Sequence, residues 1–143
     1  MDSIELNNTQ RLYIIRYLES NHCKYTNHNS DALGCYGIRP VTFKQLGLPL
    51  TANHDKVALQ NLKYIQKVTN CFSEQCLAYG WLFGPYKLLK VLKDFKYGNF
   101  PYRNPLIDNW YVKKYMKKRL KLLNFSEDLR ISFFSMPRIP GLP

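Results

Sequence analysis

The stretch YLESNHCKYTNHNSDALGCYGIRPVT, from Tyr17 to Thr42, follows an apolar helical pattern and holds most of the unusual chemistry of the chain. It begins with the carboxylate of Glu19 near the end of that pattern. It then passes through a polar loop with two histidines and two cysteines, and closes on Gly-Cys-Tyr-Gly-Ile-Arg-Pro-Val-Thr. Three kinds of site fit these residues: a metal site, a nucleic-acid loop and the floor of a catalytic cleft.

The composition sets limits on the class of protein. With 143 residues, 45% of them hydrophobic, the chain is long and apolar enough for one domain with a core, so we predict a single domain over residues 1–143. Its net charge of +11 favours polyanionic partners such as nucleic acid, anionic lipid or acidic cell-wall polymers. Eleven Tyr, eight Phe and two Trp offer ring surfaces on which bases or sugars stack.

The N-terminal residues MDSIELNNTQ are polar and acidic, without the pattern of a signal peptide or a membrane span. We therefore expect a protein made in the cytoplasm. For such a protein the default state of the four cysteines is the free thiol, although an even number also permits two disulfides.

Capping and stop signals predict a series of helices, and strand signals are weak, so the expected fold class is mainly α. The expected helices are TQRLYIIRYLES capped by Thr9, a short helix capped by Thr42 and stopped by Gly47 and Pro49, DKVALQNLKYIQKV capped by Asp55, SEQCLAYGWLF capped by Ser73, PYKLLKVLKDF begun by Pro85, and LIDNWYVKKYMKKRLKLL. The tail over residues 124–143 contains three prolines in FSMPRIPGLP and is expected to be irregular.

Glu19 lies on the apolar side of the first expected helix. At 100° per residue it falls between Leu12 and Ile15, so we expect burial to raise the pKa of its carboxyl group. A protonated glutamate at the edge of a helix suits a general acid for glycoside cleavage. The alternative is an ordinary last-turn glutamate paired with Arg16 or Lys24.

The spacing of four motifs resembles the catalytic domain of lytic transglycosylases, in the lysozyme-like superfamily, over Thr9 to Met116. The matching segments are Glu19-Ser20 at the end of a helix, ALGCYGIRPVT in register with the family's Ala-x-Gly-x-Met-Gln-Ile-x-Pro-x-Thr, AYGWLFGP in the place of Ala-Tyr-Asn-x-Gly-Pro, and Tyr111-Val112 before a basic helix. Between the second and third, DKVALQNLKYI resembles a further helix of the family.

The resemblance implies a peptidoglycan lytic transglycosylase that uses one glutamate, Glu19, as acid and then as base, with no metal and no cofactor. It cleaves the bond between N-acetylmuramic acid and N-acetylglucosamine and leaves 1,6-anhydro ends. The residues that it implies for substrate binding are Ser20, Tyr36, Gly37, Ile38, Trp81 and Tyr111. A lytic domain without a signal peptide is typical of phages, as an endolysin or a particle-borne enzyme that acts on the cell wall beside other virion proteins.

Two departures from the family pattern leave alternatives open. The family's Gln is Gly37 here and its Asn is Leu82, which permits an inactive structural virion protein with the same fold. A basic nucleic-acid-binding protein is the rival from another class, although no recognition motif accompanies the charge and we expect non-specific binding only. A zinc site from His22, Cys23, His28 and Cys35 has poor spacing, since no Cys-x-x-Cys pair is present.

Overall fold

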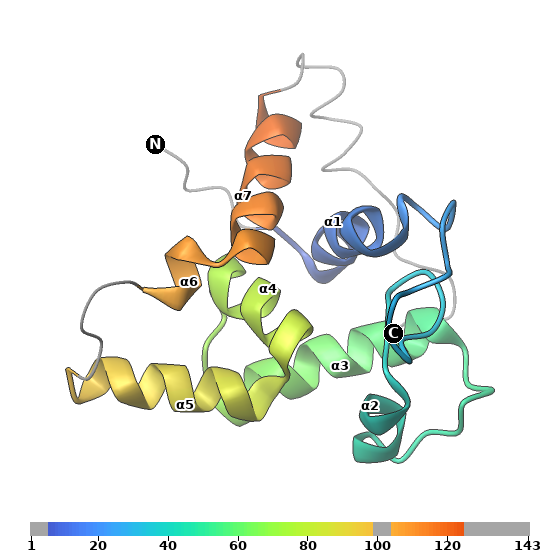
Figure 1. The fold of residues 1–143 in the computed structure, drawn as a ribbon, viewed down its shortest axis with the longest axis horizontal. Coiled ribbons are helices and arrows are strands. Elements are labelled where there is room, and N and C mark those ends of the chain that lie inside the picture. The colour runs from blue at the N-terminus through green and yellow to red at the C-terminus, as the bar shows by residue number, and fades with distance from the viewer. Residues whose placement is uncertain (1–5, 99–103, 125–143) are drawn as a thin grey trace. The chain divides into compact units, whose positions relative to one another are not determined.

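The computed structural model describes residues 6–98 and 104–124, and the fold of these residues is mainly α, as predicted (Figure 1). Its helices in chain order are α1 (Asn8–Ser20), α2 (Pro40–Gln45), α3 (His54–Thr69), α4 (Glu74–Phe83), α5 (Pro85–Lys96), α6 (Pro105–Asp108) and α7 (Trp110–Leu123). The isolated β-bridge found in the described residues pairs Leu33 with Ile38 in antiparallel fashion.

The chain divides into two compact units. Among the described residues, the first unit comprises 6–60 together with 119–124, and the second comprises 61–98 together with 104–118. Helices α3 and α7 each contribute residues to both units. The single lysozyme-like domain over residues 1–143 stays a prediction, and the tail prediction for residues 124–143 falls, apart from Asn124, outside the described residues.

Helix α1 begins two residues earlier than expected, because Asn7 and not Thr9 is its N-cap. The side chain of Asn7 accepts a hydrogen bond from the backbone N–H of Gln10, at 2.8 Å, and the side chain of Gln10 accepts one from the N–H of Asn7. This reciprocal pair is a capping box that satisfies two of the otherwise unpaired donors at a helix start. The predicted cap was therefore wrong although the helix is present. The apolar side of α1, with Leu12, Ile14 and Ile15, is buried.

The caps of α2 and α3 also differ from the prediction. Helix α2 begins at Pro40, whose fixed φ suits the first helical turn, so Thr42 lies inside the helix and not at its cap. At the start of α3 the side chain of Asn53 accepts hydrogen bonds from the backbone N–H groups of Asp55 and Lys56, at 2.9 and 3.2 Å. Asp55 is thereby released from capping and its carboxylate is used elsewhere.

In the second unit, the buried helix α4 packs against α5 and α6 (Figure 1). The predicted start of α4 is confirmed, since the side chain of Ser73 accepts from the backbone N–H of Cys76. The predicted junction between α4 and α5 is also confirmed, with Pro85 in the first turn of α5. Gly80 allows α4 to approach the side chain of Ile65 closely, because a Cβ at position 80 would overlap that side chain.

The last predicted helix is divided in two. Asn109 is extended between α6 and α7, and its side chain accepts hydrogen bonds from the backbone N–H groups of Tyr111 and Val112, at 2.8 and 3.2 Å. An asparagine inside a helical pattern competes for backbone donors and favours a new N-cap. The continuous helix predicted over LIDNWYVKKYMKKRLKLL was therefore wrong at this point.

The expectation of free thiols was wrong, because all four cysteines are paired. Cys23 and Cys35 form a disulfide in the first unit, with their Cα atoms 4.6 Å apart. Cys71 and Cys76 form a second disulfide in the second unit, with their Cα atoms 6.1 Å apart. Both Cα separations are within the usual range for a cysteine pair.

Candidate active site around Glu19

Glu19 is the penultimate residue of α1, where the helix ends in the first unit. Its side chain is partly exposed, so it is available at the surface while keeping contact with the protein. The helix stops at Asn21, which takes the left-handed conformation and donates its backbone N–H to the carbonyl of Tyr17 at 2.9 Å. This termination places Glu19 in the last turn, directly before the loop.

Three successive residues after the helix are left-handed. Asn21, His22 and Cys23 have φ values of 48°, 57° and 72°. Asparagine tolerates this region, whereas each of the other two costs about 1–2 kcal/mol of backbone strain. The conformation is held in place by the disulfide from Cys23 to Cys35 and by a hydrogen bond from the backbone N–H of Cys23 to the hydroxyl of Ser20, at 2.8 Å.

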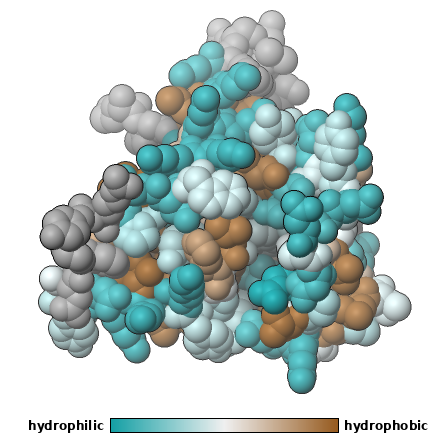
Figure 2. Space-filling view, viewed as in Figure 1, coloured by the Kyte–Doolittle hydropathy of each residue, from teal (hydrophilic) through white to brown (hydrophobic). Residues whose placement is uncertain are grey.

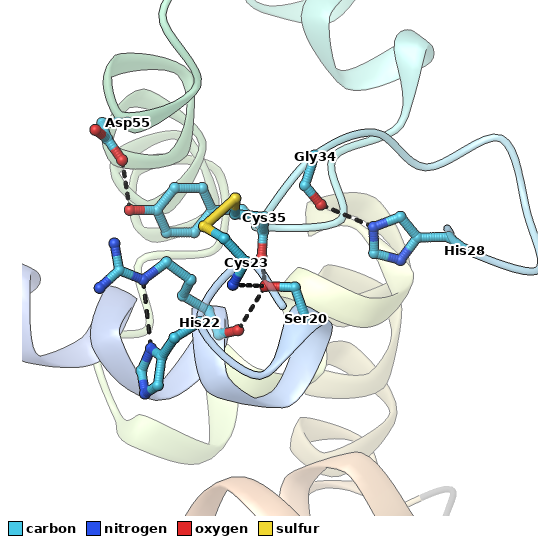
Figure 3. Close-up of a disulfide and its surroundings, with 9 residues drawn as sticks. Ser20, His22, Cys23, His28, Gly34, Cys35 and Asp55 are labelled. Carbon is cyan, nitrogen blue, oxygen red and sulfur yellow. Dashed lines mark hydrogen bonds between the residues drawn. A yellow bond between two sulfur atoms is a disulfide. The ribbon is translucent and has the colours of Figure 1, made fainter. Parts of the chain in front are cut away.

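Ser20 joins the helix end to the loop that follows it (Figure 3). Its hydroxyl oxygen lies 2.7 Å from the carbonyl of Cys35 and 3.0 Å from the carbonyl of Arg16, and a hydroxyl has one proton to donate. Ser20 is 2% exposed, and the hydrogen bonds of its hydroxyl go to backbone groups of the protein. The sequence predicted a contact with Glu19 or the substrate, whereas the geometry gives Ser20 the role of fixing the loop beside Glu19.

Gly37 is the loop residue that touches the candidate acid. It lies in the turn between the bridged residues Leu33 and Ile38, with φ of +59°. A Cβ built on Gly37 would overlap Oε1 of Glu19, so the carboxylate rests directly against the backbone of the turn. Only glycine combines this conformation with this close approach.

Tyr36 fixes the same turn from inside the first unit. Its ring is 2% exposed, and its hydroxyl donates a 2.7 Å hydrogen bond to Oδ1 of Asp55 at the start of α3. Burial, followed by the hydrogen bond and the negative charge of Asp55, raises the pKa of Tyr36 far above its usual range, while Arg16 acts in the opposite direction. Tyr36 is therefore a neutral donor that anchors the loop, and little of its ring is left for a sugar.

Two histidines flank the loop without forming a metal site. The Nε–H of Arg16 donates to Nδ1 of His22 at 3.4 Å, and the His22 ring lies 4.3 Å from that of Tyr13. His28 shares a 2.8 Å hydrogen bond with the carbonyl of Gly34 (Figure 3). Because the disulfide consumes both thiolates of the zinc alternative, that set cannot bind zinc while it is oxidised. Among the described residues, no group of three or more His, Cys, Asp or Glu side chains could hold a metal ion.

The other predicted substrate residues are buried. In the first unit Ile38 is 2% exposed and closes the turn through its bridge to Leu33. In the second unit Trp81 on α4 is 9% exposed and Tyr111 on α7 is 3% exposed. The roles proposed for Trp81 and Tyr111 beside Glu19 stay predictions.

Sequence reasoning missed the part that Asp55 plays in the site, and it named Arg16 only as a possible partner of Glu19. Asp55 was interpreted as a helix cap, although Asn53, two residues earlier, is an equally good cap and leaves the carboxylate free to accept from Tyr36. Polar residues at successive positions before a helix were the available signal. They do not by themselves show which side chain turns back to the backbone.

Comparison with known proteins gave no significant match to a family model, to a curated protein or to a solved structure. Within residues 6–98 and 104–124, no helix combines the length and the apolar character that crossing a bilayer requires. The function is therefore argued from the residues and the geometry of the site.

Proposed function

We propose that this chain is a peptidoglycan lytic transglycosylase with a lysozyme-like fold, and that Glu19 is its catalytic acid and base. The observation that carries the proposal is the contact between the Glu19 carboxylate and Gly37. This contact joins the two motifs that the sequence resemblance assigns to the catalytic cleft, although eighteen positions separate the residues in the chain.

The surrounding contacts suit a carboxylate that must keep one position during catalysis. Ser20 ties the loop to the end of α1, and the Tyr36–Asp55 hydrogen bond ties it to the start of α3. The Cys23–Cys35 disulfide joins the loop to the left-handed segment that follows α1. A general acid works efficiently only when it lies within hydrogen-bond reach of its target, so a rigid loop favours catalysis.

In the proposed first step, protonated Glu19 donates its proton to the glycosidic oxygen between N-acetylmuramic acid and N-acetylglucosamine. The bond from C1 to that oxygen breaks, and the substrate's own 2-acetamido group stabilises the positive charge that develops at C1. A separate nucleophilic carboxylate, which most retaining glycosidases have, is then unnecessary.

In the second step the Glu19 carboxylate takes the proton of the 6-hydroxyl of the same muramic residue. The oxygen of this 6-hydroxyl attacks C1 and closes a 1,6-anhydro ring. Glu19 keeps the proton that it has taken and is thereby back in its protonated form. No water is consumed. The expected site of action is the cell wall, and a phage origin with other virion proteins as partners belongs to the same proposal.

The test is mass spectrometry of muropeptides released from purified peptidoglycan sacculi. Glu19→Gln keeps the size of the side chain but removes the titrating proton, and Asp31→Asn is the matched control, because Asp31 is an exposed carboxylate paired with Arg39. We expect 1,6-anhydro products from the wild type and from Asp31→Asn, and none from Glu19→Gln.

Other outcomes contradict parts of the proposal. Products with reducing ends that require both Glu19 and Asp31 indicate a hydrolase, with Asp31 activating water. Release of no product by folded wild-type protein, on walls of several chemotypes, overturns the enzyme proposal and favours a structural protein.

A further inference from the structure

The positive charge of the chain is concentrated in the second unit. Residues 61–118 contain eleven Lys and Arg but three Asp and Glu, which leaves eight of the eleven net positive charges of the whole chain. None of this excess takes part in the proposed chemistry of Glu19. Charge of this density on one compact unit attracts a polyanion.

Helix α7 presents the largest uninterrupted part of that charge. No acidic residue occurs between Asp108 and Glu127, so no carboxylate neighbours these lysines along the helix. We call the exposed residues Trp110, Lys113, Lys114 and Lys117 the α7 lysine face. Hydrophilic residues, in teal, predominate where α7 lies in the view of Figure 2.

The opposite side of α7 fixes which residues face outwards. Tyr111, Val112 and Tyr115 are buried, and the hydroxyl of Tyr115 donates to Glu74 of α4 at 2.8 Å. Because this apolar side is packed inside the unit, α7 cannot lie in a membrane interface, which requires the apolar side of a helix to enter the lipid. The α7 lysine face is therefore available to bind a ligand in solution, without insertion of the helix into a membrane.

The spacing along the face suits a linear chain of charges. Lys113, Lys114 and Lys117 follow Trp110 by three, four and seven positions, so they share one side of the helix. Together they extend for about 10 Å at a rise of 1.5 Å per residue. Among the described residues, no ion pair involves these three lysines, and their charge is available to a ligand.

An aromatic ring lies at one end of the row. Trp110 is 58% exposed, and the ammonium of Lys114 lies 5.4 Å from the centre of its ring. Exposing an indole to water is unfavourable for its apolar surface. Its flat face beside lysine ammonium groups can, however, stack on a base while the lysines contact the neighbouring phosphate. Wall polymers made of polyol phosphate also carry phosphate charges, but they have no flat ring that could stack on the indole.

Helix α5 also carries lysines, but it fits a linear polyanion less well. Lys87, Lys90, Lys93 and Lys96 recur every three residues, so the row winds halfway around the helix. Asp94 stands among them and offsets part of their charge. The α7 lysine face has neither feature.

We propose that the α7 lysine face binds single-stranded nucleic acid, with Lys113, Lys114 and Lys117 on successive phosphates and Trp110 stacked on a base. The proposal is independent of Glu19 and of peptidoglycan cleavage. The expected binding does not depend on the base sequence, because lysines contact phosphates and an indole stacks on every base.

The first test measures binding of a fluorescein-labelled oligothymidylate by anisotropy over a range of salt concentrations. Changing all three lysines to Gln should lower the slope of log affinity against log salt by about 2, since each phosphate contact on a single strand contributes about 0.7. The matched control changes Lys24, Lys44 and Lys56 to Gln. These lysines are exposed in the first unit, and their loss should leave most of the slope of log affinity against log salt. Equal loss in both variants overturns the proposal.

The second test separates stacking from charge. The chain has two tryptophans and Trp81 is buried, so quenching of the exposed Trp110 emission reports a base against its ring. We expect quenching by oligothymidylate, none by inorganic polyphosphate, and about tenfold weaker oligonucleotide binding by Trp110→Ala, with rescue by Trp110→Tyr. Equal affinity for polyphosphate, or stronger binding to anionic lipid vesicles or to sacculi, overturns it in favour of those partners.

Discussion

Gly37 lies so close to the carboxylate of Glu19 that no side chain fits between them. The same position in the lytic transglycosylase pattern holds a glutamine, so the sequence alone suggests a lost substrate contact. The structure supplies a physical reason for the glycine. Its left-handed φ of +59° and the neighbouring carboxylate both exclude a Cβ, and the loop can therefore approach the end of α1.

Gly37→Ala should remove activity more than it removes stability. Gly47→Ala is the matched control, since Gly47 has φ of +69° but no atom within 4 Å of a built Cβ. Both variants should lose about 1–2 kcal/mol of unfolding free energy from left-handed strain. Only Gly37→Ala should displace Glu19 and abolish release of 1,6-anhydro muropeptides. Equal product release by the two variants contradicts the importance of the Gly37–Glu19 contact.

The sequence predicts those helices whose signals do not compete. Ser73 and Pro85 each stand alone at an element boundary, and both act as expected. The stripe of Ala58, Leu62, Ile65 and Thr69 on α3 is buried because period-3.6 spacing places all four on one side of the helix. In such segments local preference and packing agree.

Failures occur where two side chains compete for the same backbone groups. Asn7 prevails over Thr9 because Gln10 completes its capping box, and Asn109 begins a new helix inside a continuous pattern. The Tyr36–Asp55 hydrogen bond joins residues nineteen positions apart and leaves no local signal. Motif spacing therefore placed the candidate site at Glu19, while the contacts that position Glu19 depend on tertiary structure.

Tyr36→Phe should lower stability at neutral pH and flatten the alkaline limb of the stability profile. Loss of the hydroxyl leaves Asp55 without its 2.7 Å donor, at a cost of about 1 kcal/mol. Burial, with Asp55 second, raises the folded-state pKa of Tyr36 above the ordinary value of 10.0. The stability linked to its proton is therefore complete below pH 10 and is lost as pH rises above it. Urea unfolding at several pH values measures both effects.

Tyr79→Phe is the control for this experiment. Burial alone raises the pKa of Tyr79, so this variant should also flatten the alkaline limb. It should cost less at neutral pH, because no hydrogen bond to a carboxylate is removed. An alkaline limb of Tyr36→Phe as steep as that of the wild type would show that the Tyr36 hydroxyl ionises as easily in the fold as in water.

The two disulfides should contribute unequally to stability. Cys23 and Cys35 are 12 positions apart, whereas Cys71 and Cys76 are 5 apart. Chain-entropy arithmetic gives about 3 kcal/mol for the longer loop and about 2 kcal/mol for the shorter one. Replacing both cysteines of one pair by serine avoids a leftover thiol, and denaturant unfolding of the two double variants measures the difference. The Cys23–Cys35 variant should also lose cleavage activity, because that bond holds the strained segment after Glu19.

Alkylation shows whether the bonds form at all. Folded protein kept without reductant should resist iodoacetamide at every cysteine, and all four thiols should react after denaturation with dithiothreitol. Four labelled cysteines in the folded, unreduced protein would restore the free-thiol expectation drawn from the sequence. In that case the left-handed residues Asn21, His22 and Cys23 would lack their covalent support, and the Ser20 hydroxyl and the Tyr36–Asp55 hydrogen bond would have to hold the loop beside Glu19.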